Sequence, residues 1–314
     1  MEQPPVTEMS ANLLAGNDAL TPAVVAPESA TAEVTPAACV TCGATPATNG
    51  ADYTSAAGPS FVYAIGRIEA RFPRPDVEKE FAQATGRADT AGLSDRQAAN
   101  EVLSQPQNRY LARQLCWVMT IEGLETYILA PRDPGDVGLL VDALRPAPSP
   151  MDLDCVIGVL GPIVPPEVCN GLKVPIVVFD QLYSFDRDAL IRAIPRPEGL
   201  SEQDFSPAAT ELFDRVMQIT DNAGATDEHR ALNYLAVRYP AIYATAADEF
   251  GRNASLSAVE VQPSPLSGTR NLVDVIFSYT NRVTDVTDKF AARVDVTGEF
   301  PYLHKRLSPY YDRY

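Results

Sequence analysis

Phe61-Val-Tyr-Ala-Ile-Gly-Arg-Ile68 is the stretch at which the sequence changes character. It is dominated by β-branched and aromatic residues and predicts a strand. The sequence before it is rich in Ala, Pro and Thr and has scarcely an aromatic residue before Tyr53, so it cannot bury enough apolar surface to offset the entropy lost on ordering. We therefore expect a disordered tail over 1–60 and a folded part over 61–314.

Helix and strand signals are mixed beyond this strand, without a strict strand–helix–strand rhythm. Apolar spacing and capping residues predict helices over 76–86, 94–105, 136–145, 186–194, 206–220 and 226–239. Apolar runs and alternation predict strands over 113–120, 124–130, 153–160, 174–179, 272–283 and 290–296. The mixture favours an α+β fold with mixed, largely antiparallel sheets and surrounding helices.

Local signals set several of these boundaries. Ser94 with Gln97 three residues later forms a capping box, and Thr226 is an N-cap residue. Ser206 followed by Pro207 predicts a helix that begins there, because proline suits the first helical position. The Pro-rich stretch 145–150 is the best internal linker candidate and would join two lobes near 145–151, although a surface loop would have the same composition.

The charge balance excludes several classes of protein. The chain has 314 residues, 41 acidic against 25 Lys and Arg side chains, and a formal net charge of −16. Such a chain repels phosphate backbones and anionic lipid surfaces, so we expect neutral or basic partners and neither nucleic acid nor membrane. The N-terminus has no basic and apolar signal regions, and no stretch stays apolar for about 18 residues. A cytoplasmic protein is expected.

Cys39-Val-Thr-Cys42 is a CxxC pair with the spacing of half a zinc site. Three further cysteines, Cys116, Cys155 and Cys169, are widely separated and complete no known spacing. An odd number of cysteines in a reducing compartment argues for a metal or free thiols rather than a disulfide framework. We expect a structural zinc ion held by Cys39 and Cys42 and completed by Cys116 and Cys169.

Signals for catalysis are weak throughout the sequence. It contains no phosphate-binding loop, no strand-coupled G-x-G-x-x-G and no G-x-S-x-G elbow. The available imidazoles are His229, in the first turn of a predicted helix, and His304, in a basic and aromatic C-terminus. A solvated or locally hydrogen-bonded histidine is the simpler interpretation of both.

Asp180 and Asp186 follow a buried strand, where acidic side chains often line a site. They could act on a substrate, but Asp186 is also well placed to cap the next helix. Cys116 and Cys155 lie in apolar strands and are expected to behave as small hydrophobes. Cys169, in a turn-rich loop, is either a ligand or reactive thiol or a structural one.

Residues 302–314 mix basic and aromatic side chains in an otherwise acidic chain. Aromatic residues together with Arg are typical interface anchors. A segment that folds back over its own core would have the same composition, so both interpretations stay open.

Several runs resemble one family, the C-terminal domain of unknown function shared by the cyanobactin maturation proteins PatA and PatG. They are Phe61–Glu69, Val77–Arg87, Asn108–Trp117, Thr120–Tyr127 and Cys169–Asp180. The resemblance covers most of the chain after about Ala38. It implies a place in the maturation of ribosomally made, post-translationally modified peptides and no known reaction. No protease domain precedes these runs, so a stand-alone homologue without protease or macrocyclase activity is expected.

Three hypotheses about function follow. The first is a non-catalytic accessory domain that binds a precursor peptide or a maturation enzyme of the same pathway. The second is a zinc- or thiol-dependent hydrolase or peptide-modifying enzyme, using Cys169 or a metal-bound water with Asp180 or His229. The third is a self-associating scaffold, which would form a homo-oligomer.

Overall fold

The computed structural model describes residues 59–86, 92–196, 201–219 and 221–311. By its contacts the chain divides into residues 1–58 and 59–314, and all described residues belong to the second unit. Residues 1–58 of the tail predicted over 1–60, with Cys39 and Cys42, therefore lie outside the described residues. No helix among the described residues has both the length and the apolarity needed to cross a membrane.

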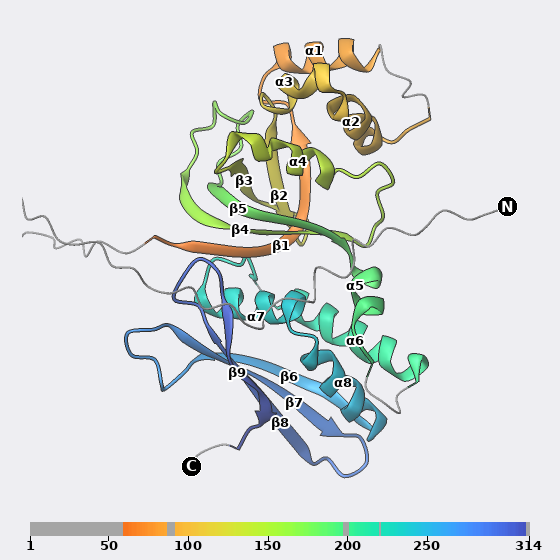
Figure 1. Cartoon of the computed structure of the whole chain (residues 1–314), viewed down its shortest axis with the longest axis vertical. Helices are drawn as coiled ribbons and strands as arrows, with labels where there is room; N and C mark the ends of the chain where they lie inside the picture. Colours follow the sequence, from red (N-terminus) through yellow and green to blue (C-terminus); the bar gives the residue numbers. More distant parts are fainter. Residues whose placement is uncertain (1–58, 87–91, 197–200, 220, 312–314) are drawn as a thin grey trace, which may run out of the picture. The chain divides into compact units, whose positions relative to one another are not determined.

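The first half of the described chain forms a closed five-stranded barrel (Figure 1). Its strands, in the order β1-β2-β3-β5-β4, are β1 (Phe61–Arg71), β2 (Cys116–Ile121), β3 (Leu124–Pro131), β5 (Pro175–Asp186) and β4 (Asp152–Ile163). The β3–β5 pair is parallel and the other pairs are antiparallel. Four helices accompany the barrel: α1 (Pro75–Thr85), α2 (Asp95–Ser104), α3 (Arg109–Ala112) and α4 (Val137–Ala143).

The second half consists of helices and an open antiparallel sheet. The helices are α5 (Arg187–Ala193), α6 (Glu202–Met217), α7 (Asp227–Arg238) and α8 (Ala241–Gly251). The sheet has the order β6 (Ala254–Pro263), β7 (Leu272–Asn281), β8 (Thr287–Asp295) and β9 (Tyr302–Pro309). The predicted α+β fold with largely antiparallel sheets is confirmed.

Strand β1 is buried on both faces and belongs to two cores. Val62, Ala64 and Ile68 join the barrel interior and the helices α1 to α4 in one core. Tyr63 and Ile65 point the other way, into a core built from helices α5 to α8 and the inner face of the β6–β9 sheet. Helices α6 to α8 thus lie between the barrel and the sheet, as Figure 1 shows. A strand covered on both faces reads as a continuous apolar run, which is why this stretch stands out in the sequence.

Most local signals act as the sequence predicts. Ser94 and Gln97 form the capping box of α2, and Thr226 accepts the His229 N–H at the start of α7. Glu122 and Gly123 both have positive φ, 49° and 81°, as the tight turn between β2 and β3 requires.

The predicted start of α6 at Ser206 is wrong. The helix begins at Glu202, so Pro207 lies inside it. Phe205 is only 3% exposed in the core, and its burial holds the additional turn in helical form although Pro207 cannot donate a backbone hydrogen bond.

The Pro-rich stretch 145–150 connects α4 to β4 within the barrel, since β4 pairs with β1. It is thus a loop inside one architectural unit. Residues 302–309 form β9, whose Leu303 and Leu307 pack against the core, so this part of the C-terminal run covers its own fold.

A backbone clasp joins β1 to the segment before α7. The Tyr63 N–H donates to the Gly224 carbonyl at 2.9 Å, and the buried Asn233 amide donates to the Tyr63 carbonyl at 2.8 Å. Asn233 is held in turn by Asn222 through two hydrogen bonds of 2.7 and 3.1 Å. Gly224 has φ +73°, and a Cβ there would lie 2.3 Å from the Tyr63 carbonyl oxygen. Only glycine allows this approach.

We expect Gly224→Ala to lower the free energy of unfolding by about 3 kcal/mol or more, because the added methyl group combines left-handed strain with a backbone clash. Gly123→Ala is the matched control: its φ is +81°, but a Cβ there meets nothing within 4 Å. It should cost only about 1 kcal/mol. Urea unfolding of both variants measures the two losses of stability. Equal losses would show that the backbone of Tyr63 does not exclude a side chain at position 224.

Candidate functional site

A groove of about 630 Å³ opens between the end of β1, helices α1 and α2, and the residues flanking β2 and α4. Its apolar lining includes Ala70, Phe72, Phe81, Leu115 and Leu144. The rings of Phe72 and Phe81 contact each other with centroids 5.2 Å apart, and Leu115 and Leu144 are buried. A concave apolar surface of this volume is typical of ligand sites.

The acidic side chains of the groove are available to a ligand, whereas its arginine is already engaged within the protein. Glu69, Glu78 and Asp95 are exposed along it. Arg96 of α2 also lines it, but its guanidinium donates to the carbonyls of Ile68, Ala143 and Leu144 at 2.6, 2.8 and 3.0 Å. Arg96 is therefore used to fasten α2 to β1 and to the end of α4. The charge left for a ligand is negative.

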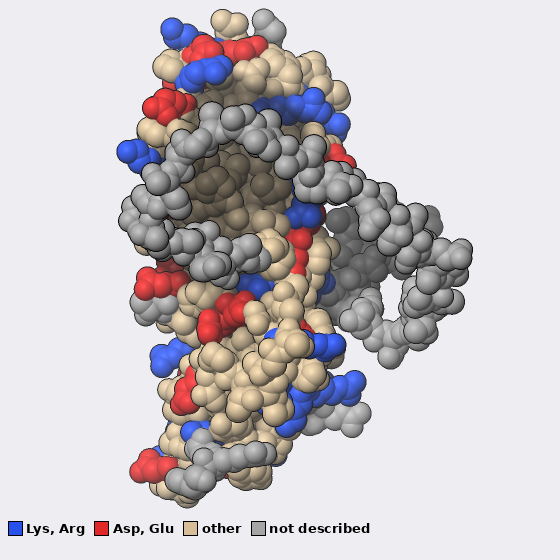
Figure 2. Space-filling view, turned by 90° about the vertical axis from the view of Figure 1, so that its left-hand side faces the viewer, with Lys and Arg blue, Asp and Glu red and all other residues tan. Residues whose placement is uncertain are grey.

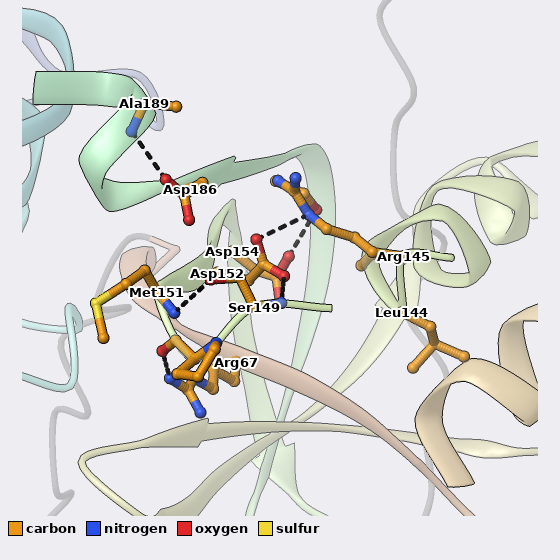
Figure 3. A network of polar contacts seen from close by, with 12 residues as sticks. Arg67, Leu144, Arg145, Ser149, Met151, Asp152, Asp154, Asp186 and Ala189 are labelled. Atoms are coloured by element: carbon orange, nitrogen blue, oxygen red, sulfur yellow. Dashed lines mark hydrogen bonds and ion pairs between the residues drawn. The ribbon is translucent and has the colours of Figure 1, made fainter. Parts of the chain in front are cut away.

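A network of acidic side chains lies beside this fastening point (Figure 3). The Asp154 carboxylate accepts the Ile68 N–H at 2.8 Å and the Ser184 hydroxyl at 2.6 Å, which ties β4 to β1 and β5. Asp154 is 2% exposed, and its burial raises its pKa to about 6. Neighbouring Asp152 pairs with Arg145 at 3.5 Å. These carboxylates are enclosed by the protein, so their role is structural.

The second feature is a carboxyl pair, Asp180 of β5 and Glu299 of the β8–β9 loop. Arg132, just after β3, forms ion pairs with Asp180 at 2.8 Å and with Glu299 at 3.2 Å. Buried Arg230 of α7 holds the loop by donating to the Val296 carbonyl at 2.8 Å and to the Glu299 carbonyl at 3.4 Å. Burial, and then the nearby Asp180, raises the pKa of Glu299 to about 7. Arg132 therefore bridges two carboxyls at the junction between the barrel and the second half.

The third feature is a pair of thiols under the loop that follows β4. Cys116 and Cys169 share a small core with Val118, Ile128 and Val164. The Cys116 thiol donates to the Val168 carbonyl at 3.3 Å, and burial together with the neighbouring Cys169 raises its pKa to about 12. Cys169 is 1% exposed. A substrate cannot reach either sulfur, although two of the four predicted zinc ligands are indeed neighbours.

The remaining predicted site residues are dispersed. Asp186 caps α5, since its carboxylate accepts the Ala189 N–H at 2.8 Å. His229 lies in the first turn of α7, where burial lowers its pKa. His304 is exposed on β9, and Cys155 is buried in the core that contains Tyr63. Cys169, Asp180 and His229 therefore have different surroundings and do not form one constellation.

Within the described ranges, no three His, Cys, Asp or Glu side chains are arranged to hold a metal ion. The zinc site with Cys39, Cys42, Cys116 and Cys169 stays a prediction. Sequence reasoning missed Glu299 and Arg132, which have no local signal, and it missed the apolar groove. Helical spacing of Phe81 in α1 was the one hint of that surface.

The carboxyl pair predicts a distinct pH dependence. Because the folded pKa of Glu299, about 7, exceeds the ordinary value of 4.5, the folded state holds a proton that the unfolded state loses between these pH values. Stability from this group is present at pH 4.5 and falls as the pH rises to 7. Glutamine does not titrate, so Glu299→Gln should lack this loss. We expect the free energy of unfolding of Glu299→Gln, relative to that of the parent protein, to rise by on the order of 2 kcal/mol between pH 5 and pH 8.

Urea unfolding of both proteins at the two pH values measures this gain. Glu260→Gln, at an exposed position of β6, is the control and should leave the difference unchanged. A Glu299→Gln variant that is equally destabilised at both pH values would show that Glu299 is ionised throughout and serves only as a partner of Arg132.

A structural zinc site that uses Cys116 and Cys169 predicts stoichiometric zinc in protein purified without chelator. Mass spectrometry should show its loss in the Cys116→Ser/Cys169→Ser variant, with a lower melting temperature. Cys155→Ser should retain the metal, because Cys155 belongs to a different core. Zinc below about a tenth of an equivalent in the parent protein would contradict the site.

Comparison with known proteins agrees with this architecture. Residues 199–310 match the family described as PatG C-terminal. The solved structure titled "PatG Domain of Unknown Function" matches with a TM-score of 0.65 and 22% identity over 80% of this chain and 99% of that chain. Comparison with curated proteins gave no match. The resemblance predicted from the sequence is confirmed: residues 199–310 are similar to the PatG C-terminal family, and the described fold is that of the PatG domain of unknown function.

Proposed function

We propose that this chain is a non-catalytic binding domain whose groove between α1 and α2 holds a peptide segment with an apolar side chain next to a basic one. The setting we propose is the maturation of ribosomally synthesised peptides of the cyanobactin type. The partner is the precursor peptide or a maturation enzyme that carries such a segment.

The chemistry of the groove supports this choice of ligand. An apolar floor with Phe72, Phe81 and Leu144 accepts an aliphatic or aromatic side chain, and burying one contributes about 1.5 to 3 kcal/mol. Glu69, Glu78 and Asp95 favour a cation beside it. Residues 1–58 contain no Lys or Arg, so this segment of the same chain lacks the required charge.

The dispersed candidates for catalysis support binding rather than turnover. Cys169 is buried, Asp186 caps a helix, and Asp180 is paired with Arg132, which also binds Glu299. A nucleophile, its base and an oxyanion donor must converge within hydrogen-bond reach of one another. The described residues that the sequence nominates do not converge.

The similarity to PatG supports the pathway. PatG-like proteins accompany precursor cleavage and macrocyclisation, as the resemblance implies, and an accessory domain in such a pathway would recognise peptide segments rather than transform them. The fold covers 99% of the solved PatG domain, so both the barrel and the second half are common to the two.

The test is fluorescence anisotropy with a labelled synthetic peptide, acetyl-Gly-Leu-Phe-Lys-Gly-amide. Ala82→Trp fills the groove, whereas Gln83→Trp adds the same ring at the next position of α1, which is exposed and does not line the groove. We expect Ala82→Trp to weaken binding at least about tenfold, a loss of 1.4 kcal/mol. Gln83→Trp should bind as the parent protein does.

The charge requirement has its own control, the peptide with Glu in place of Lys, which should bind about tenfold more weakly than the Lys peptide. Absence of binding to the Lys peptide, or equal effects of the two tryptophan variants, would contradict the proposal.

A further inference from the structure

The open sheet has two edge strands, β6 and β9, whereas the barrel is closed and has none. An edge strand presents unpaired backbone N–H and C=O groups and invites another strand to pair with it. The two edges of this sheet differ in whether neighbouring side chains bind their outward backbone groups.

Two backbone N–H groups of the β9 edge donate to tyrosine side chains. The Leu303 N–H donates to the Tyr234 hydroxyl at 3.2 Å, and the Leu307 N–H donates to the Tyr239 hydroxyl at 3.0 Å. Both tyrosines belong to the α7 region, which covers this edge. No strand can add there without displacing them.

The β6 edge has no such cover. The Ser264 N–H donates to the Leu272 carbonyl at 2.7 Å. In the antiparallel register that this bond sets, the backbone N–H and C=O groups of residues 258, 260 and 262 point toward β7. The backbone groups of Val259 and Val261 therefore point away from β7. Among the described residues, no hydrogen bond is made to these N–H or C=O groups. A register shift near Ser257 and the imino acid Pro263 limit the open window at its two ends.

A groove of about 410 Å³ runs beside this window. Ala258 and Val259 of β6 form one wall, and Arg215, Gln218 and Ile219 at the end of α6 form the other. Arg215 is exposed and takes part in none of the ion pairs found among the described residues. Val259 and Val261 pack toward the helices, so Glu260, which alternates with them, lies on the opposite face of the sheet. Figure 2 shows that Lys, Arg, Asp and Glu side chains are interspersed on one face of the molecule. Arg215 differs from such scattered surface charges because it lines a groove beside an open strand edge.

We propose that the β6 edge binds one short extended peptide segment as an added strand, with an acidic side chain of the peptide directed at Arg215. Backbone pairing with Val259 and Val261 gives affinity, and the α6 wall with its arginine gives specificity, as in other cases of strand addition. A second copy of the chain, pairing through its own β6, is the alternative occupant that the test below distinguishes from a peptide. This site is separate from the groove between α1 and α2 and needs an acidic rather than a basic segment, so it stands independently of that groove.

The experiment is fluorescence anisotropy with the labelled peptide acetyl-Thr-Val-Glu-Val-Thr-amide and the full chain. Val261→Pro removes the outward N–H and leaves the pairing with β7, because proline is tolerated at an edge where its nitrogen faces solvent. We expect it to weaken binding at least about tenfold. Val261→Thr keeps the N–H and nearly the same shape and should bind within about twofold of the parent.

If circular dichroism shows that Val261→Pro does not fold, a second test exchanges the charges of position 215 and of the peptide. Arg215→Glu should weaken binding of the Glu peptide about tenfold, and the peptide with Lys in place of Glu should recover it. Ala82→Trp in the α1 groove should leave binding of the Glu peptide to the β6 edge unchanged, so failure of one proposal can be told from failure of the other. The proposal is overturned by absence of binding at millimolar peptide, by lack of rescue in the charge exchange, or by a dimer in sedimentation that Val261→Pro dissociates.

Discussion

The burial of β1 on both faces is the constraint on which the rest of the structure depends. One strand fills the barrel with Val62, Ala64 and Ile68 and supplies Tyr63 and Ile65 to the helices behind it. A surface strand would need polar residues at every second position, and this strand has none until Arg67. The clasp from Gly224 and Asn233 to Tyr63 fixes the spacing between barrel and helices, so the two halves share backbone hydrogen bonds as well as a core.

This arrangement leaves both proposed binding surfaces at the periphery. The barrel interior is filled by side chains and closed at its edges, so a ligand must approach its accompanying helices, where α1 and α2 leave an apolar groove. In the second half, the helices cover the inner face of the sheet, and only its edges can offer backbone groups. Both surfaces have complementary chemistry for peptides: one is apolar with acidic neighbours, and the other is an unpaired strand beside an arginine. The two proposals thus assign a segment with a basic residue to the first surface and a segment with an acidic residue to the second.

The sequence predicts those elements whose signals are local. Capping residues located α2 and α7, and apolar runs located β1, β4 and β5. It did not reveal β6 or β9, because edge strands carry mixed residues such as His304-Lys-Arg306 that read as surface. Closure of the barrel depends on the parallel β3–β5 pair, which joins residues far apart in the chain. For the same reason the sequence nominated Asp180 but not its partners Arg132 and Glu299, and the neighbouring positions of Cys116 and Cys169 were expected without any spacing to support them.

The central claim is that β1 makes the barrel and the second half one cooperative unit. The chain's single tryptophan, Trp117, is buried in the barrel core, and its fluorescence reports unfolding of that half. Hydrogen exchange of the β7 amides, residues 272–281, reports on the other half in the same urea series. A shared core and clasp predict one midpoint for both probes. If β7 loses protection at a lower urea concentration while Trp117 keeps its native fluorescence, the two halves unfold separately, and β1 does not couple them.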